Sequence, residues 1–157
     1  MSISSADQKA APGRIVVGVD GSPSSKEALR WAVAQSRLTG QPVDAVMSWD
    51  YPVDYAIGPV ITFEWAGNAS LALENAVNEV VHGEDARRIA QHVERGHAAH
   101  VLLDAAADAA LLVVGSRGHG GFTGLLLGSV SQQVVTHAAC PVGVVRAHAA
   151  AAKPAEA

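Results

Sequence analysis

Glycine and serine residues gather in one stretch of the chain, residues 113–135, at the spacing Gly115-x2-Gly118-x9-Gly128-Ser129. Glycine has no Cβ, so a ligand can approach the backbone N–H groups closely. The stretch follows an apolar run and leads into a helical pattern, and free N–H groups of a loop and a helix start bind anionic oxygens. The pattern predicts a phosphate cradle at Gly115, Gly118 and Gly128. A glycine-rich turn with only a structural role is the alternative.

Four side chains of this stretch could contact a phosphate ligand directly, and a fifth, Asp20, could contact another part of the same ligand. Ser129 and Ser131 would add hydroxyl donors, and Arg117 would either offset phosphate charge or point to solvent. His119 would hydrogen-bond a terminal phosphate, or it is a solvated loop histidine. A carboxylate repels a triphosphate, so Asp20 is expected to meet ribose hydroxyls or to reach phosphate through Mg²⁺, unless it only caps the turn that follows.

Composition and spacing exclude several other classes of binding protein. The motif G-x-x-x-x-G-K-[ST] is absent, and residues 18–22 (GVDGS) do not supply the dinucleotide motif G-x-G-x-x-G after the first apolar run. The lysines are Lys9, Lys26 and Lys153, and none suits a P-loop or a Schiff base. The net charge is -4 and the basic residues are scattered, which argues against nucleic-acid binding. The histidines show no spacing for a transition-metal site.

Apolar runs of strand length alternate with helical patterns along the chain. The predicted strands lie at residues 14–20, 42–49, 86–94, 109–116 and 141–146, and the predicted helices at about 23–39, 68–82, 97–108 and 129–137. The alternation predicts an α/β fold with a doubly wound five-stranded parallel sheet and helices on both faces. Because the third strand is the most polar, it suits an edge, which gives the order 3-2-1-4-5. Ligands bind where such winding reverses, here between the strands that Asp20 and Gly115 end.

The first predicted helix has signals at both ends, and a long segment without a clear period precedes the second. Ser22 is the predicted N-cap of the first helix, with Pro23 in its first position and Gly40 at its end. Residues 50–67 show no clear period and contain Tyr51, Tyr55, Phe63 and Trp65, so they are predicted to form one long loop. This loop would either cover the crevice or pack its rings against the sheet.

The length of 157 residues predicts one folded domain. We expect this nucleotide-binding domain at residues 14–146, with disordered tails at 1–13 and 147–157. No apolar run is long enough for a membrane span and the first residues do not resemble a secretory signal, so a cytoplasmic protein is expected. The one cysteine, Cys140, is interpreted as a buried, inert thiol.

The motif Gly115-x2-Gly118-x9-Gly128-Ser129, with "IVVGVDGSPSS" before it and "CPVGVVR" after it, resembles the universal stress protein family of the ATP-binding subtype. The resemblance covers residues 14–146 and implies a homodimer that binds an adenine nucleotide, often with Mg²⁺. It places the adenosine part against Gly18, Val19 and Asp20, and adenine against the main chain of Ser48, where an aliphatic residue is more usual. It places the phosphates against two short segments: Gly115, Ser116, Arg117 and Gly118, and Gly128, Ser129, Val130 and Ser131.

Three functions are compatible with these residues. The first is a regulatory module for the stress response that binds ATP or a related adenine nucleotide as a homodimer. The second is a slow Mg²⁺-dependent ATPase with Asp20 on the metal and His119 or Ser129 near the γ-phosphate, although no residue is clearly a general base. The third is an interaction scaffold without nucleotide. The last strand, Pro141 to Arg146, is an apolar edge without protective charge, so it is the predicted dimer contact.

Overall fold

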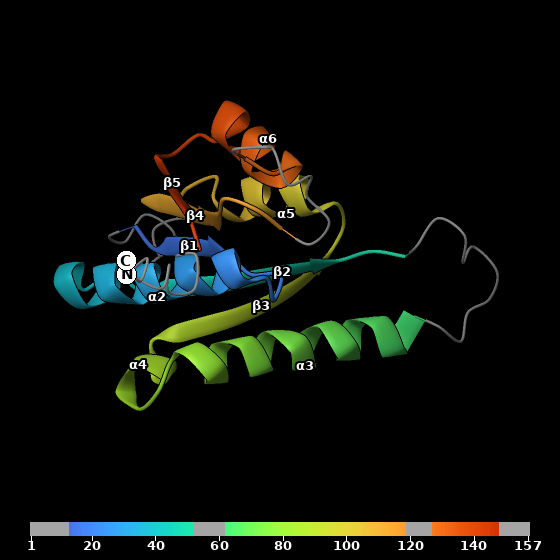
Figure 1. Ribbon diagram of the computed structural model, residues 1–157, viewed down its shortest axis with the longest axis horizontal. Helices are drawn as coiled ribbons and strands as arrows, with labels where there is room; N and C mark the ends of the chain where they lie inside the picture. Colours follow the sequence, from blue (N-terminus) through green and yellow to red (C-terminus); the bar gives the residue numbers. More distant parts are fainter. Residues whose placement is uncertain (1–12, 52–61, 119–126, 148–157) are drawn as a thin grey trace, which may run out of the picture.

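The computed structural model describes residues 13–51, 62–118 and 127–147 of the chain (Figure 1). Its strands form one parallel sheet in the order β3-β2-β1-β4-β5. The strands are β1 (Ile15–Gly18), β2 (Val43–Trp49), β3 (Ile89–Arg95), β4 (Leu111–Gly115) and β5 (Val142–Val145). The helices are α2 (Pro23–Thr39), α3 (Thr62–Val80), α4 (Glu84–Arg87), α5 (Ala98–Ala105) and α6 (Ser129–His137). The predicted fold class and strand order are confirmed.

Helices cover both faces of the sheet, with α2 and α3 on one side and α5 and α6 on the other (Figure 1). The central strand β1 is apolar throughout because it is buried from both sides. Ile15 and Val17 pack in the core under α2 and α3, whereas Val16 packs in the core under α5 and α6. The polar strand β3 is an edge, as predicted, and Ile89 is its one buried residue.

The predicted signals at both ends of α2 are confirmed. The Ser22 side chain accepts a hydrogen bond from the N–H of Ser25 at 3.3 Å, and Pro23 occupies the first helical position. Gly40 ends the helix with a φ of 75°, and its N–H donates to the carbonyl of Ser36 at 2.8 Å. These caps fix where α2 begins, directly after the carboxyl end of β1.

The region between β2 and β3 differs from the prediction. Helix α3 begins at Thr62 instead of about residue 68, so residues 62–67 are not part of a loop. Residues 62–67 show no clear apolar period, which favours a loop, and the helix includes Gly67 because a glycine inside a helix costs only about 1 kcal/mol. The four-residue helix α4 occupies residues 84–87, so β3 begins at Ile89 instead of residue 86. The acidic residues Glu84 and Asp85 favour this turn because they lie at a helix N-terminus.

The predicted aromatic loop falls partly within the described residues. Residues 52–61, with Tyr55, lie outside the described residues, and so does the side chain of Phe63. Tyr51 lies edge-on against Trp49, with ring centroids 5.3 Å apart. No described helix has the length and the apolar character needed to cross a membrane.

Candidate functional site

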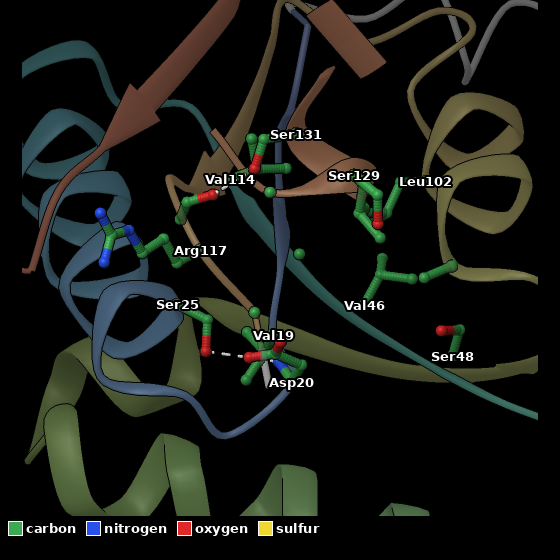
Figure 2. A pocket seen from close by; sticks show the side chains of 16 residues that line it. Val19, Asp20, Ser25, Val46, Ser48, Leu102, Val114, Arg117, Ser129 and Ser131 are labelled. Atoms are coloured by element: carbon green, nitrogen blue, oxygen red, sulfur yellow. Dashed lines mark hydrogen bonds between the residues drawn. The ribbon is translucent and has the colours of Figure 1, made fainter. Parts of the chain in front are cut away.

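A cavity of about 350 Å³ lies at the carboxyl end of the sheet, where the order reverses between β1 and β4 (Figure 2). This volume is within the range of small-molecule sites. Eleven of the residues predicted from the sequence line it: Gly18, Val19, Asp20, Ser48, Gly115, Arg117, Gly118, Gly128, Ser129, Val130 and Ser131. The fold therefore brings together the ends of β1, β2 and β4 and the first turn of α6.

Two predicted residues are not in the lining. Ser116 is buried, and its backbone holds the two ends of the glycine-rich segment together. Its N–H donates to the carbonyl of Val145 at 2.8 Å, and its carbonyl accepts from the N–H of Gly128 at 2.7 Å. His119 lies outside the described residues.

Five lining residues were not predicted from the sequence: Ser25, Val46, Ala98, Leu102 and Val114. Val46 lies two residues before Ser48 on β2 and shares its face of the sheet, so strand alternation could have identified it, whereas Val114 lies on the opposite face of β4 from Gly115. Ala98 and Leu102 belong to α5, and their place depends on how α5 packs over the sheet. Together Val46 and Leu102 give this end of the cavity an apolar wall (Figure 2).

The first turn of α6 faces the cavity with its backbone N–H groups uncapped by a side chain. The N-cap residue is Gly128, which has no side chain to accept those hydrogen bonds. Unpaired N–H groups at a helix start attract anionic oxygens, and the helix dipole adds to this attraction. Ser129 at this position is exposed, so its hydroxyl is accessible from the cavity.

Ser131 has a different role from the one predicted. The residue is only 3% exposed, and its hydroxyl donates to the carbonyl of Gly115 at 2.6 Å (Figure 2). A hydroxyl has one proton to donate, so Ser131 ties α6 to the end of β4 and does not donate to a ligand.

Asp20 lies on the cavity wall and also organises the turn before α2. Its Oδ1 accepts a hydrogen bond from the N–H of Ser22 at 2.8 Å, and its own N–H donates to Oγ of Ser25 at 3.3 Å (Figure 2). Turn capping by Asp20, one of the three roles considered above, is therefore present. A Cβ added to Gly118 would lie 2.8 Å from Oδ2 of Asp20. Glycine at 118 thus lets the loop approach this carboxylate.

The glycines at the ends of β1 and β4 have packing roles. A Cβ on Gly115 would lie 2.5 Å from Oγ of Ser24 and 2.7 Å from the backbone N of Ser25, inside the first turn of α2. A Cβ on Gly18 would lie 2.8 Å from Cδ1 of Leu102. Close approach to α2 therefore explains glycine at 115 without any ligand contact. At Gly128 the nearest atom would be 3.5 Å away, an ordinary contact.

Arg117 is held by its backbone. Its carbonyl accepts hydrogen bonds from the hydroxyls of Ser22, at 3.3 Å, and of Ser24, and its N–H donates to Oγ of Ser24 at 3.3 Å. In Figure 2 its guanidinium extends away from the part of the cavity formed by Val46 and Leu102. The glycine-rich segment is thus anchored to α2 at its start.

The site has little titratable chemistry in the part of the chain that the structure describes. Asp20 and Arg117 are the lining residues with ionisable side chains. No group of three or more His, Cys, Asp or Glu residues that could hold a metal ion occurs within residues 13–51, 62–118 and 127–147. The arrangement therefore suits binding of an anionic molecule with an apolar part.

Comparison with known proteins agrees with this geometry. The family model described as the universal stress protein family matches residues 12–146. The chain belongs to the universal stress protein family. A universal stress protein of Mycolicibacterium smegmatis is 38% identical over 146 residues, which cover 89% of this chain and 48% of that protein. The chain spans about half the length of the curated relatives it matches.

Solved structures of universal stress proteins share the fold. UspA from Lactobacillus plantarum superposes with a TM-score of 0.70 at 25% identity, covering 85% of this chain and 97% of the other. A universal stress protein crystallised in complex with cAMP has a TM-score of 0.56 at 25% identity, covering 87% of this chain and 98% of the other.

Proposed function

We propose that this universal stress protein is an adenine-nucleotide-binding regulatory module of the ATP-binding subtype, which acts as a homodimer in the stress response. The cavity at the reversal of the sheet carries the proposal, because one end of it presents the uncapped first turn of α6 and the other an apolar wall. A nucleotide needs this combination of an anion site and an apolar surface. The complex of a related universal stress protein with cAMP supports the proposal that the base of the bound nucleotide is adenine.

The proposed pose follows from the two ends of the cavity. The phosphates would lie on the N–H groups at the start of α6 and on the Gly118 backbone, with the Ser129 hydroxyl as a further donor. The base would lie between Val46 and Leu102, with the main chain of Ser48 at its edge. Asp20 would then face the ribose, where a carboxylate accepts hydrogen bonds from hydroxyl groups.

Mg²⁺ fits this site as an ion held mainly by the phosphates. Mg²⁺ is commonly bound through one or two carboxylates together with substrate phosphates and water. Asp20 is the one carboxylate in the described lining, and its Oδ1 already accepts from Ser22. The ion would neutralise the phosphate charge next to Asp20 and so reduce the repulsion between the phosphates and the carboxylate.

A binding role is favoured over ATP hydrolysis by the residues at the site. Hydrolysis needs a group that can take a proton from water within hydrogen-bond reach of the γ-phosphate. Among the described lining residues only Asp20 is a carboxylate and none is a histidine, and Asp20 is committed to the turn before α2. Slow hydrolysis therefore remains the second candidate.

We also propose that residues 14–146 are the nucleotide-binding domain, with tails on both sides, and that two copies associate through β5. β5 is an edge of the sheet, and all four of its residues are partly exposed. An apolar edge with free backbone groups pairs readily with a second strand. An ATP-dependent module with a free cysteine suits the cytoplasm.

Nucleotide released from the purified protein tests the function. The full chain is denatured, and the supernatant is analysed by chromatography with mass detection. We expect an adenine nucleotide from the wild type and from Gly67→Ala, a control glycine on α3 whose Cβ would meet nothing within 4 Å. The variant Gly118→Ala should release no nucleotide, because the Cβ of the new alanine displaces the Asp20 carboxylate.

The outcome that contradicts the proposal is an absence of adenine nucleotide in all three proteins together with no binding when ATP and Mg²⁺ are added. Product formation separates the two candidate functions. Less than about one turnover per hour with intact binding identifies a module, whereas faster turnover identifies an enzyme.

A further inference from the structure

Another cavity, of about 410 Å³, shares Arg117 and Gly118 with the first but is otherwise lined by different residues. Three parts of the chain form it: the start of α2, the segment after β4, and the residues that follow β5. Its lining consists of Ser22, Pro23, Ser24, Ser116, Arg117, Gly118, Arg146 and Ala147. Arg117 and Gly118 also line the first cavity, and Arg146 ends the predicted dimer contact, but no ligand has been assigned above to this cavity itself.

The described lining of the second cavity is positively charged. Arg117 and Arg146 contribute two guanidinium groups from parts of the chain that are 29 positions apart in sequence, and the described lining contains no carboxylate. The first cavity, in contrast, includes Asp20. The N-terminus of the 17-residue helix α2 adds a partial positive charge on the same wall.

The backbone that presents these arginines is fixed before any ligand arrives. The hydroxyls of Ser22 and Ser24 both donate to the carbonyl of Arg117, which holds the segment 116–118 against α2. The N–H of Ser116 donates to the carbonyl of Val145, the residue directly before Arg146, at 2.8 Å. Hydrogen bonds within the fold therefore fix the backbone next to both arginines.

Guanidinium groups favour one class of ligand. The planar fork of N–H donors on arginine matches the oxygens of a phosphate, and two such groups neutralise a phosphate dianion. The volume suits a small molecule. We propose that this cavity is a second binding site, distinct from the proposed nucleotide site, for a small phosphate monoester.

The two cavities share a wall, which has a consequence for regulation. Arg117 and Gly118 line both of them. A ligand that shifts the segment 116–118 in one cavity changes the affinity of the other, and the effect is reciprocal. The coupling rests on the proposed nucleotide function, whereas the second site itself does not.

The test is a titration of the ¹⁵N-labelled full chain with inorganic phosphate and with glycerol phosphate at constant ionic strength, followed by NMR. We expect saturable shifts at the amides of Ser24, Gly118 and Arg146. Arg146→Gln should weaken binding about tenfold, as expected for the loss of one charged hydrogen-bond partner. Arg87→Gln, which removes another exposed arginine, on α4, should bind like the wild type.

Three results would overturn the second site: shifts that do not saturate, equal affinities in Arg146→Gln and Arg87→Gln, or complete displacement of phosphate by ATP at one shared site. In the last case the cavity only extends the nucleotide site. If phosphate monoesters bind with the predicted dependence on Arg146 while ATP does not bind at all, the second site stands and the proposed function fails.

Discussion

Gly115 at the end of β4 offers a sharp test of how the candidate site is built. Its substitution by alanine adds one methyl group directly against the first turn of α2. That methyl would lie 2.5 Å from Oγ of Ser24, 2.7 Å from its carbonyl carbon and 2.7 Å from the N of Ser25. Two of these three atoms belong to the backbone, so a rotamer change cannot relieve the contact. The start of α2 has to move away from β4.

The expected cost lies at the upper end of the range for overpacking, about 3 kcal/mol. Movement of α2 also strains the bonds from Ser22 and Ser24 to the carbonyl of Arg117. With a urea m-value of about 2 kcal/mol/M, typical of a domain of this size, the midpoint of unfolding should fall by about 1.5 M. The matched control is Gly128→Ala, because a Cβ there makes contacts of 3.5 Å or more. Its stability should stay within about 1 kcal/mol of the wild type.

Urea unfolding followed by far-UV circular dichroism measures both variants under the same conditions. A Gly115→Ala midpoint equal to that of the wild type would refute the packing account of this glycine. Equal losses in both variants would also refute it, because general sensitivity of the loop to alanine would then explain the data.

Three further predictions concern other parts of the molecule. Static light scattering should give twice the chain mass of 16.1 kDa at micromolar concentration, and a mass of 16.1 kDa would contradict pairing through β5. Burial raises the pKa of the Cys140 thiol, so less thiolate forms and iodoacetamide should modify the native protein more slowly at pH 8 than the urea-unfolded chain; equal rates would contradict this. The hydrogen bond from Arg37 lowers the pKa of Asp85, so the ionised Asp85 carboxylate stabilises the folded state. This contribution to the free energy of unfolding is complete at pH values above the ordinary carboxyl pKa, and it is lost as the pH falls through the lowered pKa. The stability difference between wild type and Asp85→Asn in urea unfolding should therefore shrink as the pH falls below the ordinary carboxyl range, and a difference that stays constant with pH would contradict this.

The order of the sheet could be predicted from the sequence because the strands differ in polarity. A continuous apolar run such as residues 109–116 needs cover on both faces, whereas the polar residues around Ile89 suit an edge. The start of α3 could not be predicted in this way. Its first turns carry no apolar period, so the sequence favours a loop at residues 62–67, although the helix tolerates Gly67.

In the candidate site, too, some positions could be predicted from the sequence and others could not. The ends of β1 and β4 meet because of topology alone, so Asp20 and Gly115 could be placed together from the sequence. Leu102 could not be placed, since its position depends on the packing of α5. The roles of Gly115 and Ser131 also escaped prediction, because both face contacts within the protein that sequence patterns do not show.

Calorimetric titration of the purified, nucleotide-free full chain with ATP in the presence of Mg²⁺ tests the central claim most directly. Our account predicts saturable binding of one nucleotide per chain, with loss of binding in Gly118→Ala and retention in Gly67→Ala. No measurable binding up to millimolar ATP by the folded wild-type protein would contradict it.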